Sequence, residues 1–336
     1  MKTNGQKVKA ILFTIAFPIA AWIVMEILVY LVKGRHVLGT MLDLKTLVRN
    51  AGIAAITAFA LSFNLTSGRM DLSLGAQRLA GVIIGGVLAI KLGLSGIWIL
   101  LFSLAFGLVF GLITGLMFIA LRVPPMVLGI GMGLIWEVFP YQYSAGKGLN
   151  LFGVSGVEIL SNTAFIIILT VVVGAFVTVL MNSTRFGYQL RAIQGSQLIA
   201  QNSGINIFRH TVLCYMFAGG LVCIAGVMEV SFTTQLASTL GLASNGPVTS
   251  NMFPMILGGY IGRKSNDAVG TIVAALAINI IRYGLVQLDL SEANASVVNM
   301  VLFVGFLVFL ANETVLSRRR AEKARIEEAR FHAQTV

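Results

Sequence analysis

Residues 95–120 read SGIWILLFSLAFGLVFGLITGLMFIA, and this stretch decides the fold class. It contains no charged side chain. A helix needs about 20 consecutive, mostly apolar residues to cross a hydrocarbon core of about 30 Å. The stretch therefore predicts a helix that crosses a lipid bilayer.

Similar apolar runs recur along the chain on both sides of this stretch. The candidate segments are 10–32, 50–66, 72–92, 95–120, 124–141, 163–181, 210–230, 251–262, 268–287 and 294–312. Segment 251–262 is too short to cross a bilayer alone, and its Asn251 and Pro254 favour either a re-entrant half-helix or a short tilted span. We expect an all-α, polytopic membrane helical bundle with about nine or ten transmembrane or re-entrant segments.

The composition agrees with a membrane protein. Hydrophobic residues make up 57% of the 336 residues and charged residues only 11%, against about 25% charged in soluble domains. Many of the charges lie near the two chain ends, so the formal net charge of +11 indicates contact with the inner leaflet and cytoplasm. It does not indicate nucleic-acid binding. Cys214 and Cys223 would lie on opposite faces of one helix, so no disulfide between them is expected.

The charges of the loops predict the orientation, because short cytoplasmic loops carry excess Lys and Arg. The loop 182–209 carries Arg185, Arg191 and Arg209 and no acid. Placing it inside gives an N-in, C-in topology. The loop 33–49 disagrees, since it is basic and would lie outside. We expect a transmembrane domain over residues 1–316 and a basic cytoplasmic tail over 317–336.

No catalytic motif is visible in the sequence. A P-loop needs G-x-x-x-x-G-K-[ST], and the nearest string, Gly262-Arg263-Lys264-Ser265, has arginine where the last glycine must be. The three histidines are far apart, and neither an H-E-x-x-H nor a G-x-S-x-G motif occurs. We therefore expect no enzyme activity, no metal site and no cofactor bound by this chain.

Ionisable residues within spans are candidates for ion coupling. They are Glu26, Glu137, Glu229 and Arg282. Each could instead be a snorkelling or helix-packing charge. Glu137, beside Trp136 in segment 124–141, is the best placed for coupling, although no dense relay of acids or histidines accompanies it.

Three sequence strings indicate the function of the chain more specifically together than any one of them does alone. Residues 66–75, TSGRMDLSLG, form a polar turn between two spans, in which Asp71 or Ser73 suits the start of a helix. Residues 122–125, RVPP, open segment 124–141, and proline suits a first helical turn. The third string is residues 185–206, RFGYQLRAIQGSQLIAQNSGIN, which predicts two short helices separated by Gly195 and ended by Gly204. Its apolar Leu190, Ile193, Leu198 and Ile199 predict a partner groove or a position on the lipid surface.

In this order, the strings resemble the membrane permease subunit of bacterial ABC importers of the ribose, xylose and autoinducer-2 type. That family has a G-G-I-D-L-S-V-G turn, a later V-P-P, and a loop G-x-x-x-R-A-I-G-x-N-x-x-A-A-x-x-S-G-I that docks on the ATPase subunit. Here the matches are 70–75, 123–125 and 191–205, within a resemblance over roughly 47–312. The family glycine after R-A-I is Gln194 in this chain, and Gly195 follows it.

The resemblance implies a function and a set of partners. It implies a permease of the bacterial cytoplasmic membrane that moves a small polar solute, such as a monosaccharide, by alternating access. The partners would be an ABC ATPase that binds the ATP, an extracytoplasmic solute-binding protein, a second permease copy or paralogue, and membrane lipid. The implied ATPase-docking residues are Arg191, Ala192, Gly195, Ala200, Ser203 and Gly204. Candidate pathway or gating residues are Asp71, Ser73, Trp136, Glu137 and Asn251.

An ion-coupled secondary transporter without an ATPase is the alternative. Under that hypothesis Glu137 would carry the coupling, and neutralising it would abolish uptake. Under the importer hypothesis, bulk or charge at Gly204 would abolish uptake.

Overall fold

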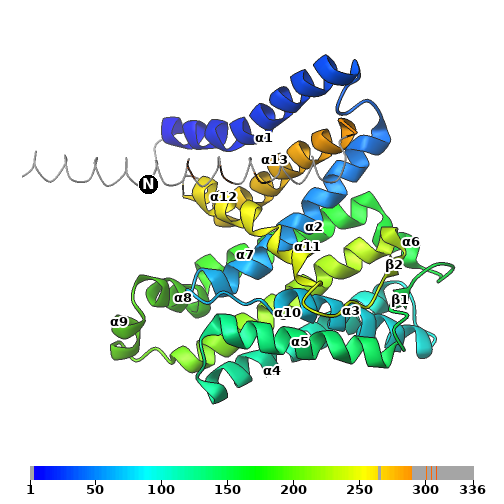
Figure 1. The fold of residues 1–336 in the computed structure, drawn as a ribbon. Helices are drawn as coiled ribbons and strands as arrows, with labels where there is room; N and C mark the ends of the chain where they lie inside the picture. Colours follow the sequence, from blue (N-terminus) through cyan, green and yellow to red (C-terminus); the bar gives the residue numbers. More distant parts are fainter. Residues whose placement is uncertain (1–3, 264–265, 290–299, 301–303, 305–307, 309–336) are drawn as a thin grey trace, which may run out of the picture. The chain divides into compact units, whose positions relative to one another are not determined.

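The computed structural model describes residues 4–263 and 266–289 together with Met300, Val304 and Val308 (Figure 1). The long helices are α1 (Asn4–Lys33), α2 (Met41–Leu65), α3 (Leu74–Lys91), α4 (Ile97–Leu121), α5 (Pro125–Tyr143), α7 (Thr163–Ser183), α10 (Ile207–Thr233) and α13 (Asp267–Gln287). The shorter helices are α6 (Val157–Ser161), α8 (Arg185–Gly195), α9 (Gln197–Asn202), α11 (Asn245–Thr249) and α12 (Met252–Gly262), and the strands are β1 (Leu149–Asn150) and β2 (Gln235–Leu236).

The prediction of a polytopic helical membrane protein is confirmed. Within the described residues, seven helices are long and apolar enough to cross a membrane: α1, α2, α3, α4, α7, α10 and α13. Helix α5 follows the predicted segment 124–141, and the segment 251–262 forms α12 behind the short α11. Segment 294–312 lies almost wholly outside the described residues, and the tail 317–336 lies entirely outside them. The N-in, C-in orientation stays a prediction.

Helix α10 lies at the centre of the compact unit Met1–Tyr283, where it packs against α4, α2 and α3. Small residues allow the close approach. A side chain at Gly111 of α4 would collide with the backbone of Tyr215, and one at Gly219 of α10 with the carbonyl oxygen of Gly107. Such small-residue contacts are typical of helices packed in membranes.

Two ends of this unit can be distinguished (Figure 1). The α8–α9 end holds the two short helices between α7 and α10. The β1–β2 end holds the antiparallel strand pair, in which Leu149 faces Leu236. Helix α2 runs toward the α8–α9 end, because the ring of Phe63 lies 6.0 Å from that of Phe186 in α8.

The connection between α2 and α3, residues 66–73, turns back into the bundle. We call it the 66–73 link. It begins beside α8, at the end of α2, and its Leu72 backbone lies so close to Gly129 of α5 that no side chain would fit there. The predicted cap of α3 differs in detail. Ser73 occupies the N-cap position without capping through its side chain, while the Asp71 carboxylate accepts the Ser73 amide at 2.8 Å.

Candidate functional site

The residues singled out in the sequence fall into two regions, apart from Asn251, which lies at the break between α11 and α12. The docking loop, residues 184–206, contains α8, α9 and the six predicted ATPase-docking residues. The buried polar core contains Asp71, Ser73, Trp136 and Glu137 at the junction of the 66–73 link, α3, α4 and α5. The structure does not bring the two sets together in one site.

The docking loop folds as two short helices, as its sequence predicts. Ser196 caps α9 by accepting a hydrogen bond from the Ile199 amide at 3.4 Å. Gly204 ends the turn with a φ of +80°, a backbone conformation that favours glycine. The Gly204 amide donates to the Gln201 carbonyl at 3.0 Å, so an orphan carbonyl at the end of α9 is satisfied.

Helix α8 is held firmly to the bundle. Leu190 and Ile193 are buried, the ring of Phe186 stacks on that of His210 of α10 at 4.4 Å, and Arg191 Nη2 donates to the Met181 carbonyl of α7 at 2.5 Å. The loop is thus connected directly to two long helices. A displacement of α8 would therefore act directly on α7 and α10 through these contacts.

Within the described residues, the outer face of the docking loop is exposed. Ala192, Gly195, Ser203 and Gly204 are exposed, whereas Ala200 is buried. Leu198 and Ile199 are each 68% exposed. The expectation that four apolar residues need an outside partner is wrong for Leu190 and Ile193, because the bundle itself covers them. Leu198 and Ile199 are exposed, as that expectation requires.

Asp71 lies at the centre of a buried hydrogen-bond network. Its Oδ1 accepts from the Ser73 amide at 2.8 Å and the Ser73 hydroxyl at 2.6 Å, and its Oδ2 from Asn64 Nδ2 at 3.3 Å. Gln77 Nε2 donates to Ser73 Oγ at 2.8 Å. The adjoining cavity measures about 10 Å³, which is room for roughly one water molecule. Asp71 and Ser73 thus connect the 66–73 link to α2 and α3 through hydrogen bonds, and the space beside Asp71 is far smaller than a monosaccharide.

Trp136 extends this network into α5. Its indole Nε1 donates to Thr114 Oγ1 of α4 at 2.9 Å, and its ring lies 4.6 Å from that of Phe110. Gln77 Nε2 also lies 3.4 Å from Thr114 Oγ1. Among the described residues, Asn64 Oδ1 and Gln77 Oε1 are buried acceptors that have no donor.

Glu137 is fully buried and accepts hydrogen bonds from a loop that is distant in the sequence. One carboxylate oxygen accepts the Leu242 amide at 2.7 Å, and the other accepts the Ser244 amide at 3.0 Å and the Ser244 hydroxyl at 2.6 Å. These donors belong to the segment between β2 and α11. Both oxygens are therefore used to fix the backbone just before the interrupted helix pair α11–α12.

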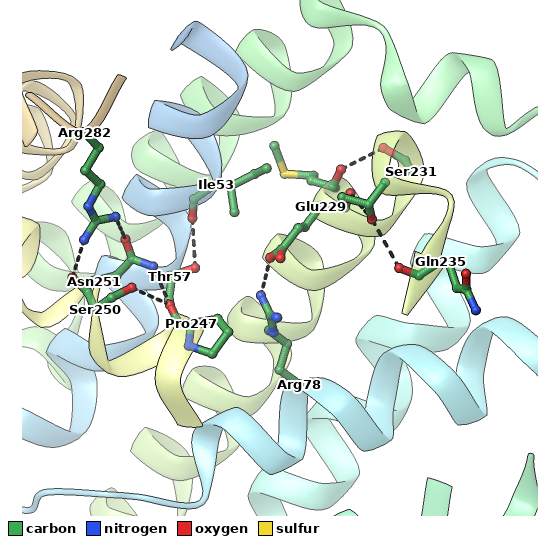
Figure 2. Close-up of polar contacts among 12 residues, drawn as sticks. Ile53, Thr57, Arg78, Glu229, Ser231, Gln235, Pro247, Ser250, Asn251 and Arg282 are labelled. Carbon is green, nitrogen blue, oxygen red and sulfur yellow. Dashed lines mark hydrogen bonds and ion pairs between the residues drawn. The ribbon is translucent and has the colours of Figure 1, made fainter. Parts of the chain in front are cut away.

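Asn251 lies at the break between α11 and α12 (Figure 2). Its amide Nδ2 donates to the Pro247 carbonyl at 2.9 Å. Arg282 of α13 donates to the Ser250 carbonyl at 2.7 Å, which places a cation at the C-terminal end of α11, where the helix carbonyls are unpaired. The break is thus built into the structure, in agreement with an interrupted segment.

The other ionisable residues in the spans also have partners. Glu229 pairs with Arg78 of α3 (Figure 2), and Glu26 accepts the Val37 amide at 3.0 Å and contacts His36. The sequence analysis did not single out Arg78, Gln77 or Asn64. Their signal was available, since each is a polar residue inside an apolar run. In the part of the chain that the structure describes, no three His, Cys, Asp or Glu side chains gather as a metal site would require.

Comparison with known proteins identifies the family. Residues 44–307 match the model of the family described as "Branched-chain amino acid transport system / permease component". The chain belongs to this family. It is therefore a multi-pass permease of the bacterial inner membrane and not itself an enzyme, as the sequence predicts.

Individual relatives of this permease cover most of its length. It is 28% identical over 277 residues to the ribose import permease protein RbsC of Bacillus subtilis, covering 80% of this chain and 84% of the relative. It is 28% identical over 324 residues to the autoinducer 2 import system permease protein LsrD of Salmonella paratyphi B, covering 90% and 95%. It is 29% identical over 292 residues to the probable ABC transporter permease protein YphD of Escherichia coli, covering 83% of each.

Proposed function

We propose that this permease forms the membrane pathway of an ABC importer for a small polar solute, such as a monosaccharide or a related compound. The names of the ribose and autoinducer 2 permeases support this solute class. A separate ATPase would supply the energy, a solute-binding protein would deliver the solute from outside, and a second permease copy or paralogue would complete the pathway. The ATP would be bound by the ATPase, since this sequence has no P-loop.

The observation that carries the proposal is the rigid attachment of an exposed docking loop. Its outer face presents Leu198 and Ile199 to a partner, and its inner face is fixed to α7 and α10 through Arg191 and Phe186. An ATPase that binds α8 and α9 differently in its two conformations would shift the helix bundle between two arrangements. The bias cannot exceed the difference in binding free energy between those states.

The ion-coupled alternative gains no support from the structure. Glu137 is the residue on which it depends, and both oxygens of Glu137 accept hydrogen bonds from residues 242–244. A coupling carboxylate must exchange its partners for an ion during transport. The observed arrangement is that of a carboxylate that fixes a loop.

The test is the association of tagged permease with a P-loop ATPase in native membranes. We would compare wild type with Gly195→Trp, because Gly195 lies in α8, is exposed, and has no atom of the described residues within 4 Å of a Cβ built there. Gly204 is a poorer choice, since its φ of +80° strains any substitution. Gly39→Trp, on an exposed residue at the opposite end of α2 from α8, is the control.

We expect the ATPase, identified by mass spectrometry and by ATP hydrolysis, to co-purify with wild type and Gly39→Trp. Gly195→Trp should lose it while remaining folded. If the chain carries no ATPase and proteoliposomes of the chain alone move solute without ATP, the proposal is overturned and the ion-coupled alternative replaces it.

A further inference from the structure

A cavity of about 700 Å³ lies at the α8–α9 end, apart from the buried polar core. The 66–73 link forms one wall with Gly68 and Arg69. Helix α9 forms another with Gln197 and Gln201. Phe118 of α4, residues 204–206 and the starts of α5 and α10 line the rest. The cavity is about seventy times larger than the space beside Asp71, and it is large enough for a small ligand or a lipid headgroup.

Arg69 gives the lining of this cavity a positive charge. The residue is only 4% exposed, yet its guanidinium has no carboxylate partner among the described residues. Its Nη1 donates to Ser67 Oγ at 3.0 Å, and its Cζ lies 5.9 Å from the Phe118 ring centroid. Buried charges in proteins are normally paired, because removing a charge from water is costly. An Arg with most of its five donors unused is suited to an anion with several oxygens.

Two helix starts add positive potential to the same space. Pro125, the first residue of α5, and Ile207 and Phe208, the first two residues of α10, line the cavity. Neither helix has an acidic residue in its first turn. Pro125 has no N–H, and Asn206 already caps the Arg209 amide of α10, so the contribution of these helix starts is the dipole, which favours negative charge. No Asp or Glu occurs among the described lining residues, and Arg69 is the one charged side chain among them.

We propose that this cavity binds a phosphate-bearing anion, with Arg69 as its main ligand and Gln201 at its rim. The headgroup of an anionic phospholipid and a small soluble phosphate compound share this chemistry. An anion that contacts both Arg69 and Gln201 would connect the 66–73 link to α9. Binding would therefore strengthen the attachment of the docking loop to the bundle. The proposal concerns this chain alone and does not depend on the ATPase.

The test uses the full chain in nanodiscs of phosphatidylcholine, with unfolding followed by tryptophan fluorescence. Phosphatidylglycerol is added to one set of discs, and inorganic phosphate is titrated into discs of phosphatidylcholine alone. Gln201→Glu places a negative charge at the exposed rim of the cavity. Asn202→Glu makes the same change of charge on the next residue, which is exposed and outside the lining. Arg69→Gln removes the main ligand.

We expect at least one anionic probe to raise the unfolding temperature of wild type and of Asn202→Glu. Apparent affinity should fall about ten- to hundredfold in Gln201→Glu and Arg69→Gln, as expected for the loss of a charge-assisted contact. A rise with phosphatidylglycerol alone identifies the lipid headgroup as the source, and a saturable rise with inorganic phosphate identifies a soluble one. The proposal is overturned if neither probe acts on wild type, or if Gln201→Glu responds as Asn202→Glu does.

Discussion

The docking loop and the buried polar core use the same kinds of polar residue for opposite purposes. In the docking loop, Ser196 and Ser203 satisfy the backbone at the ends of α9, and exposed side chains surround them. In the core, Ser73 bonds to other side chains, Asp71 and Gln77, and is fully buried. Among the described residues, the outer face of the docking loop stays exposed, whereas the polar groups of the core hydrogen-bond to one another.

This difference has an energetic consequence. A hydrogen bond at the surface can be replaced by one to water, so its loss costs little. A buried donor or acceptor that loses its partner costs its full desolvation penalty. Substitutions in the core should therefore lower stability, and substitutions on the outer face of the docking loop should lower partner binding while leaving stability unchanged.

The largest effect is expected at Glu137. Glu137→Ala removes the acceptor of three hydrogen bonds and leaves the Ser244 donors buried and the Leu242 amide partly buried without that acceptor, so we expect a loss of about 3–5 kcal/mol in the free energy of unfolding. Unfolding of the detergent-purified chain against temperature measures it. Glu158→Ala, at an exposed position of α6, is the control and should stay within about 0.5 kcal/mol. A Glu137→Gln variant with wild-type stability but no uptake would contradict the structural role and favour ion coupling.

The second-largest loss of stability is expected on the buried face of the docking loop, in contrast to its exposed face. Leu190→Ala removes a buried side chain of α8 and should cost about 2–4 kcal/mol. Leu198→Ala makes the same change on a side chain that is 68% exposed, and should cost less than about 0.5 kcal/mol. Thermal unfolding measures both. Equal losses would show that Leu198 is covered by this chain, and the outer face of the loop would then not be free for a partner.

The smallest of the three effects is expected at Asp71. Asp71→Asn keeps one acceptor oxygen but places an amide donor opposite either the Ser73 donors or Asn64 Nδ2, so we expect a loss of about 1–3 kcal/mol. Asn202→Asp, the reverse change on the exposed docking loop, should leave stability within about 0.5 kcal/mol. Unfolding in guanidinium chloride compares the two. If Asp71→Asn is as neutral as Asn202→Asp, the network around Asp71 contributes nothing to the fold.

Much of the fold could be predicted because the length of an apolar run depends only on residues that are neighbours in the sequence. Segments 95–120, 163–181 and 210–230 correspond closely to α4, α7 and α10. The two short helices of the docking loop were also predicted, since Gly204 marks a helix end through its backbone freedom. The candidate site was predicted less well. Arg78 and Gln77 were not predicted, because the length of run 72–92 does not indicate their partners, Glu229 and Thr114, which lie far away in the sequence.

The sequence by itself determined that this protein crosses a membrane many times, that residues 184–206 form a polar loop of two helices, and that the chain has no P-loop. These properties depend on runs of neighbouring residues. Only the tertiary structure decided that Glu137 fixes residues 242–244, that Leu190 faces inward while Leu198 faces outward, and that Arg69 lines a cavity with Gln201. Each of these depends on residues far apart in the chain that packing brings together, and hydrogen bonds act over only about 3 Å.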